Sequence, residues 1–214
     1  MLKLIIDQGN TQTKLALFQQ KILLKKMVFN QDNQLRELES QADSVIFSSA
    51  GDASSVLNVL EESPFLLKTN TALPIINLYE SPETLGNDRI AAVVGAATQF
   101  PKSNVLVIDA GTCITLDLFT IEGYQGGSIT PGIQMRLQVL HQQTERLPFV
   151  ELDGVVDIIG KNTISAMESG IFWGYVSMIE GLIEKIKSVN KFSDYKVVAT
   201  GGLSNLFKKP LNSI

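Results

Sequence analysis

The sequence predicts an α/β protein built from two related halves. Predicted strands and helices mix in two consecutive sets, which is typical of α/β proteins. One segment also occurs twice, as LIIDQGNTQTKLALF at residues 4–18 and, with a one-residue gap, as LVIDAGTCITLDLF at residues 106–119. The offset of about 100 residues is too long for a solenoid repeat, so it favours duplication of a β-sheet domain. Pro101 and its polar neighbours separate the two sets, and we expect one domain over residues 1–102 and another over residues 103–214.

The first half opens with strands. Alternating apolar residues predict a strand over residues 2–6, and two more are expected at 13–18 and 22–29. The tight turns between them indicate an antiparallel meander. The remaining elements expected in this half are a helix at 31–41, a buried strand at 44–49, a helix at 53–62, a short strand at 65–67, an extended segment at 73–78 and an alanine-rich helix at 87–98.

The second half repeats the pattern. Its expected elements are strands at 104–108, 115–119 and 123–129, helices at 133–146 and 162–187, and a strand at 197–199 closed by Thr200-Gly201-Gly202. The longer helix carries an apolar stripe made by Ile164, Met167, Ile171, Tyr175, Met178 and Leu182. One lobe of this size is not expected to bury the whole stripe, so we predict a homodimer with a two-fold, helix-mediated interface.

Composition excludes several classes of protein. Eighteen basic residues stand against 22 acidic ones, for a net charge of −4, which disfavours nucleic-acid binding as the main activity. No run of about 18 apolar residues is present, so we expect no membrane-spanning helix. A single cysteine excludes a disulfide within the chain. The first residues, MLKLIIDQGN, lack the features of a secretory signal, and we expect a cytoplasmic protein.

The segment from Asp7 to Lys14 is a candidate phosphate-binding turn. Gly9 permits a tight turn between two strands, whose backbone N–H groups can converge on an anion. Asn10, Thr11 and Thr13 add side-chain donors, Asp7 could hold a metal-bound water, and Lys14 could supply positive charge. Taken alone, the segment fits an ordinary hairpin better.

Asp109-Ala110-Gly111-Thr112 repeats this arrangement in the second half. Two such turns, one in each lobe, could face each other and hold a polyphosphate from both sides, which is much of what phosphoryl transfer requires. Neither turn matches the Walker pattern. The repeat therefore favours a paired phosphate clamp over coincidence.

Gly86-Asn87-Asp88-Arg89 is the remaining polar cluster, at the start of the alanine-rich helix. A carboxylate there suits the helix dipole, so Asp88 could be a capping residue beside a solvated arginine. It could equally be a general base beside a group that binds an anion or a hydroxyl. The residues alone do not decide between these two interpretations.

Taken in order, DQGNTQTK, GNDR, DAGT, GGSITPG, NTISAMESG and TGG resemble the motifs of type III pantothenate kinases over essentially the whole chain. The resemblance implies two ribonuclease H-like, actin-like lobes of the acetate and sugar kinase, chaperone ATPase and actin superfamily. It implies transfer of the ATP γ-phosphate to the primary hydroxyl of pantothenate, the first step of coenzyme A biosynthesis. Family chains usually continue beyond Asn212-Ser213-Ile214, where this one stops.

The resemblance also implies roles for individual residues. Asp88 would accept the proton, and Asp109 would bind a monovalent cation, K⁺ or NH₄⁺, used together with Mg²⁺. The implied ATP-binding residues are Asp7, Gln8, Gly9, Asn10, Thr11, Gln12, Thr13, Lys14 and Thr112. The implied pantothenate-binding residues are Tyr79, Gly86, Asn87, Asp88, Arg89 and Thr163. The family is dimeric, with the pantothenate pocket against the partner subunit.

Two other functions fit the same fold. One is a non-catalytic regulator that acts in transcription, and the other is a kinase of the same superfamily acting on a sugar or on acetate. A regulator is expected to lose catalytic carboxylates, whereas Asp7, Asp88 and Asp109 are all present. Tyr79, the GNDR segment and Thr163 disfavour a different substrate.

Overall fold

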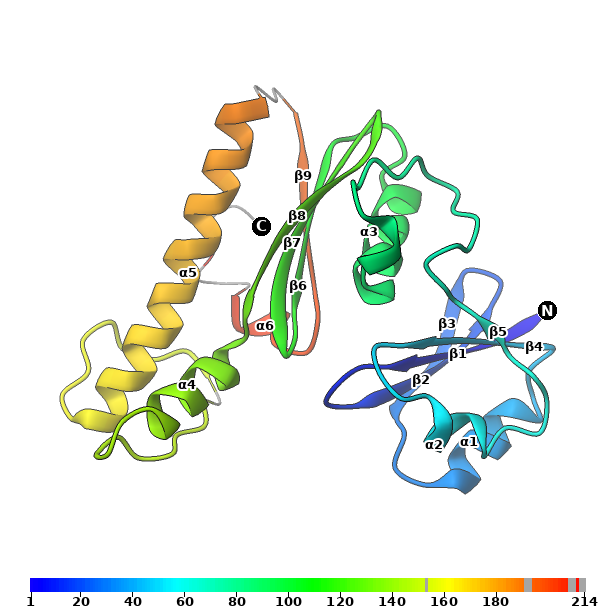
Figure 1. The fold of residues 1–214 in the computed structure, drawn as a ribbon, viewed down its shortest axis with the longest axis horizontal. Helices are drawn as coiled ribbons and strands as arrows, with labels where there is room; N and C mark the ends of the chain where they lie inside the picture. The colour runs from blue at the N-terminus through cyan, green and yellow to red at the C-terminus, as the bar shows by residue number, and fades with distance from the viewer. Residues whose placement is uncertain (153, 191–193, 208–210, 212–214) are drawn as a thin grey trace. The chain divides into compact units, whose positions relative to one another are not determined.

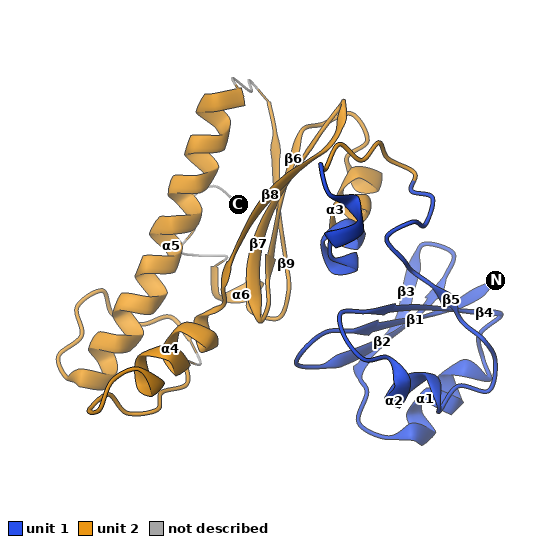
Figure 2. Cartoon of the chain, in the orientation of Figure 1, with its two compact units in different colours: residues 1–73, 80–91 blue, residues 74–79, 92–214 orange. Residues whose placement is uncertain are grey.

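A computed structural model describes residues 1–152, 154–190, 194–207 and 211 (Figure 1). Contacts divide the chain into two compact units (Figure 2). The first unit holds Met1–Leu73 and Glu80–Ala91, and the second holds Pro74–Tyr79 and Ala92–Ile214. The division passes through helix α3 (Asn87–Gln99). The boundary predicted at residue 102 separates the two duplicated halves of the sequence, and it stays a prediction.

The first unit contains a five-stranded sheet in the order β3-β2-β1-β4-β5. The first three strands pair antiparallel, which confirms the predicted meander, and the last two add in parallel. The strand bounds are β1 (Leu2–Gln8), β2 (Thr13–Gln19), β3 (Ile22–Val28), β4 (Ser44–Ser49) and β5 (Phe65–Leu66).

Two helices accompany this sheet, α1 (Asp32–Glu39) and α2 (Ser54–Leu57). Leu4, Ile6, Leu15 and Leu17 alternate along β1 and β2 and form one core with apolar residues of both helices. The helix predicted at 53–62 is much shorter in the structure, where it covers only Ser54–Leu57. A 3₁₀ turn, η1 (Pro82–Thr84), leads into α3.

The second unit contains a four-stranded sheet in the order β8-β7-β6-β9. Its strands are β6 (Val105–Ala110), β7 (Cys113–Thr120), β8 (Gly123–Pro131) and β9 (Lys196–Thr200). Strands β6, β7 and β8 form an antiparallel meander, and β9 pairs in parallel with β6. The first sheet has the same arrangement, with β4 parallel to β1, so the sequence repeat corresponds to a structural repeat.

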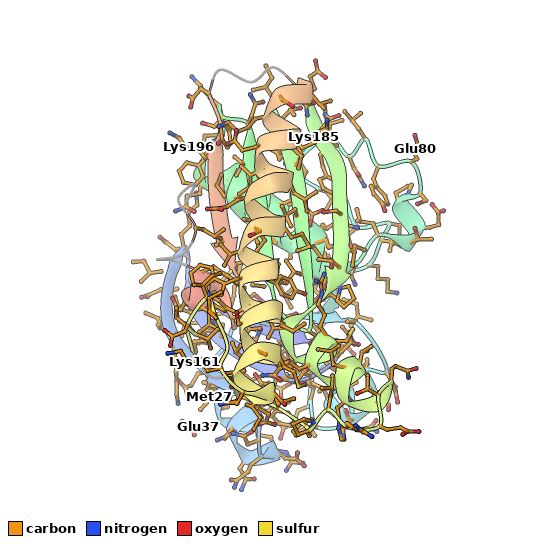
Figure 3. All side chains as sticks on the ribbon, turned by 90° about the vertical axis from the view of Figure 1, so that its left-hand side faces the viewer. Met27, Glu37, Glu80, Lys161, Lys185 and Lys196 are labelled. Carbon is orange, nitrogen blue, oxygen red and sulfur yellow. The ribbon has the colours of Figure 1, made fainter. Side chains whose placement is uncertain are left out.

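One face of the second sheet is covered by the helix α5 (Thr163–Asn190), which lies along the strands in Figure 3. Helix α4 (Ile133–Gln142) precedes it, and the short α6 (Ser204–Phe207) follows β9. Met167 and Tyr175 of the predicted apolar stripe are buried in the core of this unit, whereas Ile164 remains 48% exposed. Ile171, Met178 and Leu182 are partly buried, so the unit does not bury the whole stripe, as expected.

Within the described ranges, none of the helices combines the length and the apolar character that crossing a bilayer requires.

Candidate active site

The first candidate turn joins β1 to β2. The Gly9 N–H donates to the Gln12 carbonyl oxygen at 3.0 Å and closes the turn, so this N–H is not available to an anion. Asn10, Thr11 and Gln12 are exposed at its tip, whereas Thr13 is partly buried. The Gln8 side chain is held differently, because its Nε2 donates to the Asp52 carbonyl oxygen at 3.0 Å and its Oε1 accepts from the Ser49 hydroxyl at 3.1 Å. Gln8 therefore anchors the turn to the end of β4.

Asp7 lies among charged side chains of the first unit. Lys14 is its partner across the β1–β2 ladder, which places both side chains on the same face. Burial raises the pKa of the Asp7 carboxyl above its ordinary value of 3.8, and the Asp88 carboxylate raises this pKa too, whereas Lys14 and Lys26 lower it. Two other predicted site residues, Lys14 and Asp88, therefore lie close enough to Asp7 to change its pKa.

The GNDR segment forms the start of α3. Asp88 Oδ1 accepts a hydrogen bond from the Arg89 backbone N–H at 2.8 Å, and the Asn87 Nδ2 donates to the Leu67 carbonyl oxygen at 3.0 Å. Asp88 is exposed and Arg89 is 5% exposed. A Cβ at Gly86 would collide with the Asp88 carboxylate, so this glycine leaves room for the carboxylate at the start of α3. The carboxylate therefore satisfies one backbone N–H of the first turn of α3 and remains exposed to a substrate.

The second candidate turn joins β6 to β7 and is closed in the same way. The Gly111 N–H donates to the Cys113 carbonyl oxygen at 3.0 Å, and the Gly132 N–H donates to the Thr112 carbonyl oxygen at 2.9 Å. The Thr112 side chain is exposed. Asp109 is partly buried one residue before the end of β6, in the place that Asp7 takes in β1.

Gly201 lies directly against the Asp109 side chain. Gly201 has a φ of +91°, and a Cβ there would collide with the Asp109 carboxylate and the Ala110 carbonyl oxygen. A carboxylate oxygen and a carbonyl oxygen thus face the same small space at Gly201, and oxygen atoms are the ligands that a hard cation prefers. The described residues include no cluster of three or more histidine, cysteine or acidic side chains suited to a metal, so a site here would rely on one carboxylate.

The other two predicted substrate residues lie in the second unit. Tyr79 is partly buried, and its ring stacks on that of Tyr124 with centroids 5.9 Å apart. Thr163 is exposed at the first position of α5, directly after Asn162, whose Oδ1 caps the helix by accepting the Ser165 N–H at 2.9 Å.

Sequence reasoning missed Asp117 and Tyr124. The Tyr124 hydroxyl donates to Asp117 Oδ1 at 2.6 Å, with both residues buried. The available signal was an aspartate inside the apolar strand ITLDLF, because a buried carboxylate needs hydrogen-bonding partners.

The arrangement of the sheets agrees with that of solved structures. A Campylobacter jejuni protein described as a Baf family transcriptional activator superposes with a TM-score of 0.63 at 19% identity, over 98% of this chain and 88% of that one. Component A of the (R)-2-hydroxyglutaryl-CoA dehydratase of Acidaminococcus fermentans gives 0.55 at 14% identity, over 97% and 85%. At such identities the likeness shows the fold alone, which is an α/β fold of two related sheets, as the sequence predicted.

Comparison with known sequences identifies the family of the chain. The family model described as "Type III pantothenate kinase" matches residues 3–185. A type III pantothenate kinase of Bacteroides fragilis (strain YCH46) is 41% identical over 223 aligned positions, which span 100% of this chain and 90% of the relative. The chain belongs to the type III pantothenate kinase family.

Proposed function

We propose that this chain transfers the γ-phosphate of ATP to the primary hydroxyl of pantothenate and so makes 4′-phosphopantothenate at the start of coenzyme A biosynthesis. The observation that carries the proposal is the family match over residues 3–185, within which the motif carboxylates Asp7, Asp88 and Asp109 are all present. In the reaction, the pantothenate hydroxyl oxygen bonds to the γ-phosphorus. The bond from that phosphorus to the bridging oxygen breaks, and ADP leaves.

ATP is assigned to the two glycine turns, residues 7–14 and Thr112. The exposed side chains of Asn10, Thr11 and Thr112 can donate to phosphate oxygens, and Lys14 supplies positive charge. Bound Mg²⁺ would neutralise phosphate charge, and Asp7 is the carboxylate placed to hold one of its waters. Burial and Asp88 raise the pKa of Asp7, and Lys14 and Lys26 oppose this shift by favouring the ionised carboxylate that such a role requires.

Pantothenate is assigned to Tyr79, Gly86–Arg89 and Thr163, the positions that match the family motifs. Asp88 accepts the hydroxyl proton in this proposal. Its support is the exposed carboxylate fixed at the start of α3 by the Arg89 N–H, together with the space that Gly86 leaves beside it. The buried Arg89 adds positive charge next to the base.

Asp109 is assigned to a monovalent cation, K⁺ or NH₄⁺. The residues present fit such an ion, because the Asp109 carboxylate and the Ala110 carbonyl oxygen both face the space that a side chain at Gly201 would fill. A bound cation would offset the cost of burying this charge.

We further propose a cytoplasmic homodimer in which α5 forms the interface. The support is the apolar surface that the second unit leaves uncovered at the start of this helix, where Ile164 is 48% exposed, and in the loop before it, where Ile158 and Ile159 are 61% and 68% exposed.

A coupled assay of ADP release tests the proposed reaction. Phosphorylation of pantothenate, with no turnover of a panel of sugars or of acetate, is the expected result. Turnover of a sugar or acetate alone would replace the substrate assignment. No turnover of any acceptor, by a folded protein that binds ATP, would favour the regulator.

A further inference from the structure

The chain before Tyr79 is fastened to strand β8 of the second unit. The Tyr124 N–H donates to the Ile76 carbonyl oxygen at 2.9 Å, and the Leu78 N–H donates to the Tyr124 carbonyl oxygen at 2.9 Å. The Tyr79 N–H itself donates to Asn77 Oδ1 at 3.1 Å. These bonds set the backbone at Tyr79 relative to β8 and so restrict where its side chain can go.

The ring of Tyr79 packs between Tyr124 and Gly126. The two tyrosine rings are nearly parallel, at 22°, with centroids 5.9 Å apart, within the usual range for stacked aromatic pairs. Gly126 has a φ of +102°, and a Cβ there would lie 3.2 and 3.4 Å from two carbons of the Tyr79 ring. A side chain at position 126 would therefore push the Tyr79 ring away from its place.

Asp117 holds the second ring of the stack, that of Tyr124, through its hydroxyl. Leu116 and Leu118 belong to the core under α5, so Asp117, between them on β7, lies on the opposite face of the sheet. Its carboxylate accepts the Tyr124 hydroxyl at 2.6 Å, and the two residues are 1% and 0% exposed. Such a short, charge-assisted bond in a buried place fixes the Tyr124 ring.

We propose that Asp117 and Tyr124 are positioning residues for pantothenate. Asp117 orients the Tyr124 ring through its hydroxyl, and Tyr124 together with Gly126 keeps the Tyr79 ring in the orientation that meets the substrate. The inference rests on the proposed function, in which Tyr79 contacts pantothenate. A ring fixed before binding loses little rotational freedom when the substrate arrives, so the arrangement lowers the cost of binding pantothenate.

The test is steady-state kinetics and calorimetric binding with the full chain. Tyr124→Phe keeps the stacked ring and removes the hydroxyl, and Gly126→Ala adds a Cβ that displaces the Tyr79 ring. Because φ at Gly126 is +102°, this alanine also strains the backbone, so the Tm of each variant is measured beside its kinetics. Each is expected to raise the KM and Kd for pantothenate about two- to tenfold, the value of one hydrogen bond for Tyr124→Phe and of one aromatic pair for Gly126→Ala. Each is expected to change the KM for ATP less than twofold. Asp117→Asn keeps an oxygen that accepts the Tyr124 hydroxyl, and its KM for pantothenate is expected to stay within about twofold of the wild type.

A double-mutant cycle separates positioning from general stability. In a Tyr79→Ala background, Tyr124→Phe is expected to have no further effect on the KM for pantothenate. The matched controls are Tyr195→Phe, at a partly buried tyrosine packed against the core that includes α5, and Gly95→Ala, at an exposed helical position with open space around it. Both are expected to leave the KM unchanged.

The outcomes distinguish the two proposals. A wild-type protein that does not phosphorylate pantothenate defeats the proposed function. A wild-type protein that does so, with unchanged KM in Tyr124→Phe and Gly126→Ala, or with additive effects of Tyr79→Ala and Tyr124→Phe, overturns the positioning role alone. If Tyr124→Phe does not fold, Gly126→Ala and Asp117→Asn decide, because the proposal requires a raised KM in the first and a preserved KM in the second.

Discussion

Replacing Asp88 by asparagine tests the proposed base directly. The asparagine side chain would retain an oxygen that can accept the Arg89 N–H, which Asp88 Oδ1 now accepts at 2.8 Å, so the start of α3 is expected to persist. What is lost is the negative charge in the first turn of the helix, worth about 0.3–1 kcal/mol at an exposed position. For a chain of this size that corresponds to a fall in Tm of roughly 1–4 °C.

The kinetic effect is expected to be much larger. Loss of a general base lowers turnover by roughly 10²- to 10⁴-fold, equivalent to about 3–5 kcal/mol in the activation free energy. The transition state of phosphoryl transfer is loose, so proton removal can come late, and part of the effect would then reflect positioning of the hydroxyl. In either case kcat with pantothenate falls, while ATP still binds.

Coupled ADP release measures kcat, and calorimetry measures ATP binding. Asp32→Asn is the matched control, because it removes the same charge from the first turn of α1, and we expect normal turnover. Gly86→Ala is a complementary variant, since its Cβ would displace the Asp88 carboxylate without removing it, and kcat should fall while Gly95→Ala leaves it unchanged. Near-normal turnover in Asp88→Asn would refute this reasoning and make Asp7 the next candidate.

Four further predictions concern the other assigned roles. Thr112→Val removes an exposed hydroxyl, so the KM for ATP should rise about two- to tenfold in a protein that still folds, and wild-type ATP kinetics would contradict the phosphate role. Activity should rise when K⁺ replaces Na⁺, and equal rates in the two salts would remove the cation from Asp109. Light scattering of an active preparation should show a dimer at micromolar concentration, whereas a monomer would exclude the α5 interface. Because the pKa of Asp7 is raised in the folded state, its protonated form stabilises the fold, and this stabilisation is lost as pH rises through the folded pKa. Asp7→Asn should therefore raise Tm at pH 7 more than at pH 4, and it should also lower turnover. An unchanged or lower Tm at pH 7 would contradict the raised pKa of Asp7.

Local patterns predicted most of the strands. The repeated segment at residues 4–18 and 106–119 predicted two meanders, each with an aspartate near the end of its first strand, and both sheets have that form. Apolar alternation and turn residues are short-range features, so they can be recognised in the sequence alone. The long helix is also as expected, at Thr163–Asn190.

The lengths of two helices depended on contacts that these patterns do not contain. The Glu39 carboxylate accepts the N–H groups of Glu61, at 3.0 and 3.2 Å, and Glu62, at 3.1 Å. It thereby supplies the partners that a longer α2 would have provided, and the helix ends at Leu57. Helix α4 ends at Gln142, and just beyond it the Thr144 hydroxyl donates to the Leu140 carbonyl oxygen at 2.7 Å.

The sequence by itself determined the family, the two glycine turns and the acids near them, because each motif is a run of neighbouring residues. Only the tertiary structure decided that Tyr79 packs with the second unit on Tyr124, and that Asp117 accepts the hydroxyl of that second ring. It also decided that Lys14, Lys26 and Asp88 all act on the charge of Asp7. The reason is physical: these side chains come from separate strands, helices and loops, and folding alone creates the burial and short distances through which they interact.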